Sequence, residues 1–248
     1  MRKSDGKMPT KKISFAVGDG TVSGTVFTPE NATGKCPAVL FIHGWSSNES
    51  GYAKRAEPLV KLGYICLTFD LLGHGNSTGN LETVTLNENI SATVAAYDFL
   101  ASQENVDKDK ISVVGTSYGG YLASVLASKR KIGSIVLRVP AIYTDEYSSK
   151  AKNSMQSMRL AKEGEGPRNN IALNSISAFR NRILLITAEH DQVIPHRIIE
   201  LIIKTAKPES LKHVVIKGAD HQFLLFLANV QHCFCRLPGH SPFLVQLC

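Results

Sequence analysis

A serine flanked by glycines is the first residue whose surroundings suggest covalent chemistry. The pentapeptide Gly115–Gly119 (GTSYG) fits the pattern G-x-S-x-G, in which a sharp turn from strand to helix exposes a serine in strained backbone geometry. It directly follows the apolar run Ile111–Val114 and precedes residues with helical apolar spacing. The hydroxyl would stand at a helix N-terminus, where partial positive charge favours a developing anion. This context predicts that Ser117 is a nucleophile.

A second copy of the same pattern, Gly75–Gly79 (GNSTG), lacks this context. Leu71–His74 separate it from the preceding apolar run, and no apolar helical pattern follows it. We therefore interpret it as a glycine-rich loop and assign Ser77 a structural role.

A serine hydroxyl is a poor nucleophile without a base, so a histidine and an acid must follow along the chain. His221 lies just after the last predicted strand, at the carboxyl end where sites of open α/β sheets form. Asp191 lies 30 residues earlier, just beyond the apolar run Ile183–Thr187. We predict His221 as the base and Asp191 as the acid that fixes its tautomer and stabilises the imidazolium. Glu189 is the alternative acid.

Other histidines and acids near these motifs have structural interpretations. His43 is expected to make structural hydrogen bonds, and Asp70 at the end of a strand is also expected to be structural. His213 falls within or at the start of a strand, and His196 opens a helix. The side chain of Asp220 is expected to point away from its neighbour in sequence, the base.

Two backbone N–H groups must stabilise the anion formed when the serine attacks a carbonyl. One would come from Tyr118, the residue after the nucleophile. The other would come from Trp45, in the loop that follows the apolar run Pro37–Ile42. Gly44 is expected to let that backbone approach closely.

The elements that position these residues follow an alternating rhythm. Two alternating segments around Gly18–Gly20 predict a β-hairpin, and short apolar runs then alternate with helical patterns. This order predicts an α/β fold with a mostly parallel sheet covered on both faces. The predicted strands are Lys12–Val17, Thr21–Phe27, Pro37–Ile42, Ile65–Phe69, Ile111–Val114, Gly133–Leu137, Ile183–Thr187 and His213–Ile216. Apolar faces place the helices around Ala56–Gly63, Ile90–Leu100, Tyr121–Leu126 and Ile198–Ile202.

One polar stretch, about residues 140–177, interrupts this rhythm and predicts a lid or a flexible insertion. Met155, Met158 and Leu160 within it would either line an acyl pocket or pack as ordinary apolar residues.

Composition favours a globular enzyme over a nucleic-acid binder. The chain has 248 residues, of which 43% are hydrophobic and 20% charged, with a net charge of +7. The first twelve residues hold +4 of that charge, which indicates a basic tail over residues 1–11 before a single domain over 12–248. The sequence shows neither a signal-peptide pattern nor a membrane-spanning run, and its five cysteines are an odd number, which cannot all pair within the chain. These features favour a cytoplasmic location.

Five motifs in the same order resemble the α/β-hydrolase superfamily, near its dienelactone-hydrolase-like, serine-aminopeptidase-like and cinnamoyl-esterase-like branches. They are Phe41–Gly44, Asp70 with Gly73–Ser77, Gly115–Gly119, Glu189–Pro195 and Gly218–His221. The resemblance implies an eight-stranded sheet, a catalytic triad that needs no cofactor or metal, and hydrolysis of an ester or related acyl bond. It also implies that the 140–177 stretch forms a short cap.

The C-terminal segment 224–248 departs from that family, which usually closes with a charged amphipathic helix. Its one charged residue is Arg236, and it includes Cys233, Cys235 and Cys248. An interface, a membrane-touching tail and an out-of-frame end are all consistent with this composition. We favour the last.

These observations predict a carboxylester hydrolase that acts on a small acyl substrate through an acyl-enzyme. Peptidase or amidase, thioesterase and lactonase activities share the same core chemistry and remain open. A catalytically silent ligand-binding protein of the same fold is the alternative outside enzymes, since a fold does not enforce a function.

Overall fold

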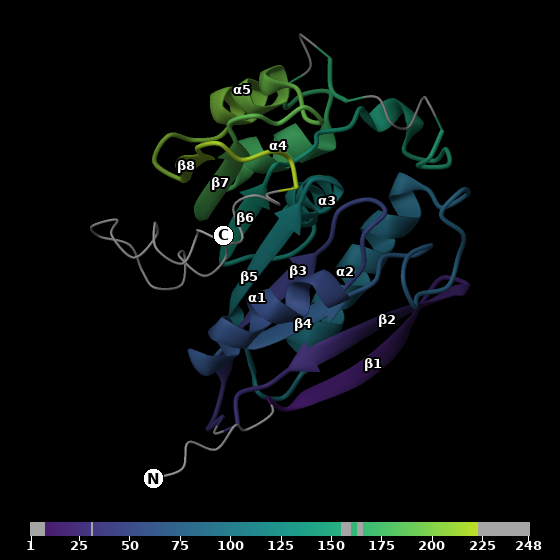
Figure 1. The fold of residues 1–248 in the computed structure, drawn as a ribbon, viewed down its shortest axis with the longest axis vertical. Helices are drawn as coiled ribbons and strands as arrows, with labels where there is room; N and C mark the ends of the chain where they lie inside the picture. The colour runs from purple at the N-terminus through teal and green to yellow at the C-terminus, as the bar shows by residue number, and fades with distance from the viewer. Residues whose placement is uncertain (1–7, 31, 155–159, 163–165, 223–248) are drawn as a thin grey trace.

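The computed structural model describes residues 8–30, 32–154, 160–162 and 166–222. In these ranges eight strands form one open sheet in the order β1-β2-β4-β3-β5-β6-β7-β8 (Figure 1). The pairs β1–β2 and β2–β4 are antiparallel, and all the others are parallel. The strands are β1 (Thr10–Val17), β2 (Gly20–Phe27), β3 (Cys36–Ile42), β4 (Ile65–Phe69), β5 (Val106–Thr116), β6 (Ser134–Arg138), β7 (Arg182–Ala188) and β8 (Leu211–Ile216). The predicted mostly parallel sheet, with its opening hairpin, is confirmed.

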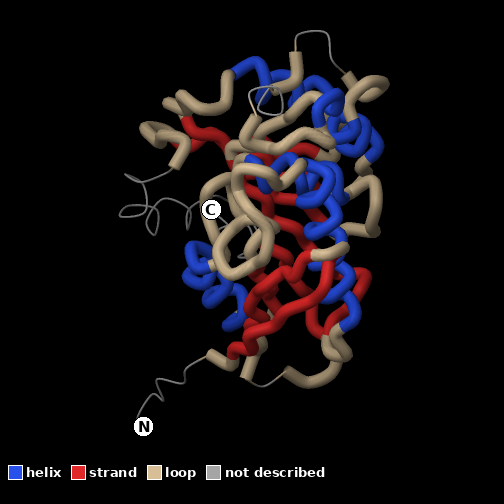
Figure 2. Tube along the Cα trace, turned by 90° about the vertical axis from the view of Figure 1, so that its right-hand side faces the viewer, coloured by secondary structure: helices blue, strands red, loops and turns tan. Residues whose placement is uncertain are grey.

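Helices cover the sheet on two sides, as Figure 2 shows. The helix α1 packs on one face, and α2, α3, α4 and α5 pack on the other. Because successive side chains of a strand point to opposite faces, β3 must be apolar on both. Val39 and Phe41 join the cluster under α1, whereas Leu40 and Ile42 join the other one. The helices are α1 (Ser50–Lys61), α2 (Leu86–Ser102), α3 (Tyr118–Leu126), α4 (Ile171–Ala178) and α5 (His196–Thr205).

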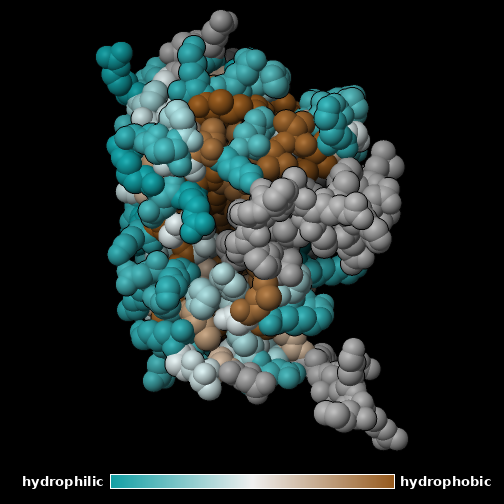
Figure 3. Space-filling view, turned by 90° about the vertical axis from the view of Figure 1, so that its left-hand side faces the viewer, coloured by the Kyte–Doolittle hydropathy of each residue, from teal (hydrophilic) through white to brown (hydrophobic). Residues whose placement is uncertain are grey.

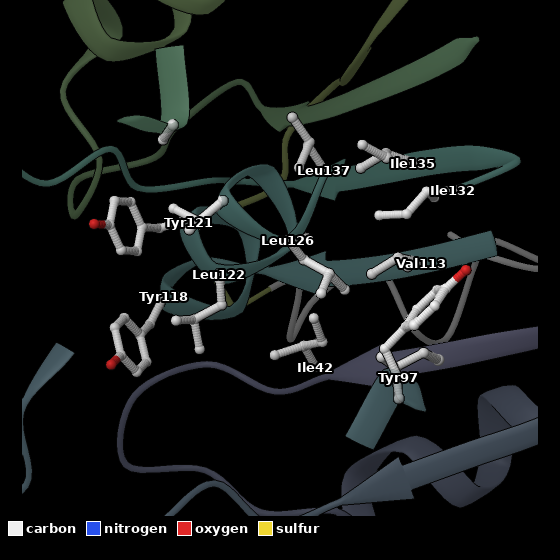
Figure 4. Packing of buried hydrophobic residues seen from close by; sticks show 14 of the residues in the cluster. Ile42, Tyr97, Val113, Tyr118, Tyr121, Leu122, Leu126, Ile132, Ile135 and Leu137 are labelled. Carbon is white, nitrogen blue, oxygen red and sulfur yellow. The ribbon is translucent and has the colours of Figure 1, made fainter. Parts of the chain in front are cut away.

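The helix α3 lies at the centre of the larger core cluster. In Figure 4, Leu122 and Leu126 point toward Ile42 of β3 and Val113 of β5. All nine residues of α3 are buried. This burial fixes the helix whose N-terminus follows Ser117 against the middle of the sheet.

Two details of the helices differ from the sequence interpretation. Gly63 is not part of α1, which ends at Lys61, and its φ of +89° is one that side-chain-bearing residues rarely adopt. The helix α4, which begins inside the 140–177 stretch and ends at Ala178, is absent from the sequence prediction. The sequence features of this helix are few. The Asn170 side chain caps the Leu173 N–H at 3.1 Å, and the buried apolar residues are Ala172, Leu173 and Ile176.

Two isolated bridges tie down described parts of the 140–177 stretch. Ala151 forms an antiparallel bridge with Thr85, and Tyr143 forms another with Leu160. A 3₁₀ turn, η1 (Asp145–Tyr147), lies between these contacts. Met155 and Met158 lie outside the described residues, as do residues 1–7 and the unusual segment 224–248.

Apolar surface remains on the face that carries the β8 edge, in the upper part of Figure 3. The large apolar side chains exposed among the described residues are Leu62, Val193, Ile203 and Val215. None of the helices in the described ranges combines the length and the apolar character that crossing a bilayer requires.

Candidate active site

Ser117 stands at a strained turn between β5 and α3. Its φ of +53° and ψ of −113° are rare for a residue with a side chain. The surrounding backbone holds this conformation: the Ser117 N–H donates to the Arg138 carbonyl at 2.9 Å, and its carbonyl accepts from Gly120 at 2.9 Å and Ala141 at 3.1 Å. The strain predicted from the G-x-S-x-G pattern is therefore present at Ser117.

The two outer glycines of the pentapeptide are required by space. A Cβ on Gly115 would lie 2.2 Å from the carbonyl oxygen of Gly119. A Cβ on Gly119 would lie 2.2 Å from the carbonyl oxygen of Ile42, at the end of β3. Backbone atoms cannot yield at such distances. Glycine at 115 therefore lets the turn close, and glycine at 119 lets the turn approach β3.

His221 and Asp191 meet Ser117, although the three residues come from distant parts of the chain. The His221 Nε2 lies 3.1 Å from the Ser117 Oγ. On the other side of the ring, Nδ1 lies 2.8 Å and 3.0 Å from the two carboxylate oxygens of Asp191. With Nδ1–H donating to the carboxylate, Nε2 is left as an acceptor for the serine proton.

The Asp191 carboxylate is fixed in its ionised form. Burial raises the pKa of Asp191, but hydrogen bonds from His221 and from two backbone amides outweigh it and leave the pKa below its usual value. Those amides belong to Val193 and Ile194, each 2.9 Å from the same carboxylate oxygen.

Glu189, the alternative acid, lies elsewhere. One of its carboxylate oxygens accepts from the Gly218 N–H at 2.8 Å, and the other lies 3.6 Å from the Lys217 ammonium. Backbone bonds from Glu189 to Ile216 and from His190 to Ala219 run alongside. Glu189 therefore ties the loop after β7 to the loop that bears His221.

The two residues predicted to supply the oxyanion-hole amides, Trp45 and Tyr118, contact each other through their side chains. Tyr118 is the first residue of α3, so its N–H has no carbonyl partner within the helix. The Trp45 ring packs edge-on against the Tyr118 ring at 5.3 Å, which places the two residues side by side. A Cβ on Gly44 would meet the Thr116 carbonyl oxygen at 3.4 Å and the Ser117 Cβ at 3.6 Å, which are ordinary contacts.

Two buried neutral histidines fix the loop that carries Trp45. His43 Nε2 accepts from the Leu71 N–H at 3.0 Å, and its Nδ1 donates to the Gly44 carbonyl at 2.7 Å. His74 Nε2 accepts from the N–H of Ser46 at 3.3 Å, and Ser46 has a positive φ of +60°. Burial lowers the pKa of His43 to about 4 and also lowers the pKa of His74. Both rings are thus neutral acceptors near neutral pH.

Ser77, in the second G-x-S-x-G copy, is part of a structural network. Its Oγ donates to the Asp70 carbonyl at 2.6 Å and accepts from the Ser23 N–H at 2.9 Å. The buried carboxylate of Asp70 accepts from the amides of Glu49 and Asn76, each at 2.7 Å. The structural interpretations of Ser77 and Asp70 agree with these contacts.

His213 and His196 make contacts outside the Ser117 turn. His213 is in β8 and bonds to the Thr187 hydroxyl at 2.8 Å, and His196 is exposed at the start of α5. Sequence reasoning missed Lys152, which is buried beside Trp45, because nothing in its local sequence distinguishes it from surface lysines. Among the described residues, no three His, Cys, Asp or Glu side chains converge as a metal site would require.

Comparison with known proteins places this geometry among hydrolases. A protein of Mycobacterium tuberculosis described as uncharacterized is 28% identical over 203 residues, which are 82% of this chain and 69% of that one. The mitochondrial palmitoyl-protein thioesterase ABHD10 of Bos taurus is 34% identical over 107 residues, 42% of this chain and 33% of its own length. The crystal structure of the α/β hydrolase GrgF from Penicillium covers 97% of this chain and 98% of its own, with a TM-score of 0.75 at 15% identity.

A protein-family match covers more than half of the chain. The profile described as X-Pro dipeptidyl-peptidase (S15 family) matches residues 19–164, which include Trp45 and Ser117 but end before Asp191 and His221. Together with the open eight-stranded sheet, these comparisons identify the chain as a hydrolase of the α/β-hydrolase superfamily that belongs to the X-Pro dipeptidyl-peptidase (S15) family.

Proposed function

We propose that this chain hydrolyses carboxylic esters through an acyl-enzyme on Ser117. The observation that carries the proposal is the position of His221, whose two ring nitrogens lie within hydrogen-bond distance of Ser117 and Asp191. A nucleophile, a base and an acid that orients the base are the groups that covalent acyl transfer requires.

The steps follow from these contacts. Ser117 Oγ attacks the ester carbonyl carbon while its proton passes to His221 Nε2, and the Trp45 and Tyr118 amides donate to the oxyanion. The C–O bond to the alcohol then breaks, and His221 returns the proton to the leaving oxygen. Water gives its proton to His221 and attacks the acyl-enzyme, which releases the acid and restores Ser117. Asp191 stays ionised throughout and stabilises the imidazolium.

An X-Pro dipeptidyl-peptidase activity is the second candidate, because the family profile covers the Ser117 turn. Such a substrate presents a free α-ammonium, which an acidic side chain would bind. Two acids lie on the loop after β7: Asp191 already contacts His221, and Glu189 is bound to the Gly218 N–H. The buried cation of Lys152 beside Trp45 would repel an ammonium. These contacts favour the neutral ester.

A p-nitrophenyl ester series, from acetate to decanoate, tests the proposal with the purified chain. Ser117→Ala should abolish turnover, whereas Ser77→Ala, from the matched G-x-S-x-G copy, should retain it. Turnover that survives in Ser117→Ala would refute the serine mechanism. Equal loss in both variants would point to unfolding, which circular dichroism would detect.

The same three proteins should also be assayed on Gly-Pro-p-nitroanilide and on a palmitoyl thioester. Faster Ser117-dependent release from the anilide than from every ester would favour the peptidase. Preference for the thioester would instead place the chain with the thioesterase that it resembles over 107 residues.

A further inference from the structure

Lys152 is a buried cation that the proposed reaction does not use. Its side chain is only 1% exposed, whereas lysine is almost never fully buried without a partner. It enters from the 140–177 stretch, where the Lys152 N–H donates to the Val84 carbonyl at 2.6 Å and Ala151 pairs with Thr85. The backbone at Val84 and Thr85 therefore holds this lysine against the body of the protein.

Three aromatic rings enclose the ammonium group. Its Nζ lies 4.3 Å from the ring centre of Tyr143, 4.8 Å from that of Trp45 and 5.3 Å from that of Tyr118. All three distances lie within the range of about 6 Å for cation–π attraction. No carboxylate of the described ranges lies within ion-pairing distance of this ammonium. The ring faces, rather than an acid, compensate the charge.

This aromatic cage (Trp45, Tyr118 and Tyr143) is built on the oxyanion-hole residues. Figure 4 shows the Tyr118 ring at the outer end of the core cluster, directed away from Leu126. Trp45 and Tyr118 also contact each other edge-on, and Tyr118 and Tyr143 do so at 5.8 Å. A cation that attracts all three rings at once restricts the backbones that bear them.

We propose that Lys152 is a positioning residue: its ammonium holds Trp45 and Tyr118 together, so that their amides stay aligned as the oxyanion hole. The cage also couples that alignment to the docking of the 140–177 stretch, through Tyr143 and Lys152 itself. This inference rests on the proposed function, because the amides matter only if an oxyanion forms on Ser117.

The cage should weaken in mildly alkaline solution. Burial lowers the pKa of Lys152 to about 8, so the ammonium is neutralised as the pH rises through that value. A neutral amine has no cation–π attraction, and the alignment should loosen. The titratable groups that face the cage are His74, Glu88, Tyr118, Tyr121, Tyr143 and Asp145.

The histidine and the tyrosines among these neighbours have pKa values shifted away from pH 8. Burial lowers the pKa of His74 and raises the pKa of each tyrosine. The Glu88 carboxylate is fixed by the Thr85 amide and hydroxyl, and Asp145 accepts from the Ile171 N–H. A transition near pH 8 at the cage is therefore assigned to Lys152.

Trp45 is the only tryptophan in the sequence, so its fluorescence reports directly on the cage. The emission of the full chain should change with a midpoint near pH 8. Lys152→Met, which keeps a long chain without the charge, should lack this transition, whereas the matched control Lys150→Met, an exposed lysine in the same stretch, should keep it. An identical transition in Lys152→Met, or none in the wild-type chain, would overturn the proposal. Circular dichroism excludes unfolding as the cause.

Turnover of a p-nitrophenyl ester gives the second readout. Lys152→Met should lower kcat by roughly tenfold, as expected from a desolvated cation–π contact, with KM nearly unchanged because the oxyanion exists only in the transition state. The alkaline fall in wild-type kcat should also be absent from this variant. An unchanged kcat would refute the positioning role. Failure of the proposed function appears differently, as wild-type turnover equal to that of Ser117→Ala, while the fluorescence still decides the cage.

Discussion

Replacing Asp191 by asparagine is expected to disable catalysis while leaving the fold in place. An asparagine carbonyl can still accept from the Val193 and Ile194 amides, which lie 2.9 Å from the carboxylate. Its NH₂ group, however, would face His221 Nδ1, which now lies 2.8 Å from a carboxylate oxygen. That donor favours the tautomer with the proton on Nε2, and Nε2 could then no longer accept the Ser117 proton.

The size of the effect follows from the loss of the base. A wrong tautomer in a correctly folded triad lowers kcat by about 10⁴. At about 1.36 kcal/mol for each factor of ten, this is about 5 kcal/mol of transition-state stabilisation. The change should appear in kcat rather than KM, because Asp191 contacts His221 and not the substrate.

The assay is p-nitrophenyl butyrate hydrolysis near neutral pH, with kcat and KM measured for Asp191→Asn and a matched variant, Glu189→Gln. A glutamine oxygen can accept the Gly218 N–H that Glu189 binds at 2.8 Å, so this variant should retain most of its activity. An Asp191→Asn protein of nearly wild-type rate would refute the assignment. A large loss of kcat in Glu189→Gln alone would instead assign the role of the acid to Glu189.

Three further predictions concern the turn and the loops around it. Gly119→Ala should lower the free energy of unfolding by about 3 kcal/mol, because its Cβ would overlap the Ile42 carbonyl. The control Gly51→Ala should not destabilise the chain, because a Cβ there has nothing within 4 Å. Urea unfolding measures both variants. Burial lowers the pKa of His43 to about 4, so the folded state binds fewer protons than the unfolded chain below about pH 6.5. Stability should therefore fall by up to about 3 kcal/mol between pH 6.5 and 4, and a His43→Gln protein with the same pH dependence would contradict this. Ser77→Ala should lower the melting temperature, because its hydrogen bonds to Asp70 and Ser23 are lost, and should leave kcat unchanged. A loss of kcat would contradict a purely structural role for this loop.

Local sequence was sufficient to predict those features that depend on residues adjacent along the chain. The strained geometry of Ser117 could be predicted because a strand, a tight turn and a helix follow within a few residues, and only glycine fits at Gly115 and Gly119. The same reasoning separated Ser117 from Ser77, whose loop is followed by neither a helix nor an apolar pattern. Strand positions followed from continuous apolar runs because both faces of the sheet are buried.

Some features of the structure could not be predicted because their sequence patterns are too short or too polar. The helix α4 has eight residues, and its few apolar positions stand inside a polar stretch, so periodicity could not reveal it. The space beside Gly44 depends on how the Trp45 loop packs over the β5–α3 turn, which local sequence does not fix. Burial of Lys152 depends on three aromatic residues far from it in sequence.

The sequence by itself predicted the order of the strands along the chain, the strained turn at Ser117, and His221 as the histidine that would serve it. These follow from spacing, because parallel strands bring their carboxyl ends to one edge of the sheet. Only the tertiary structure decided between Asp191 and Glu189 as the partner of His221, showed two neutral histidines supporting the Trp45 loop, and enclosed Lys152 in aromatic rings. Those outcomes depend on side-chain directions and burial, which are fixed when distant segments pack together and exclude water.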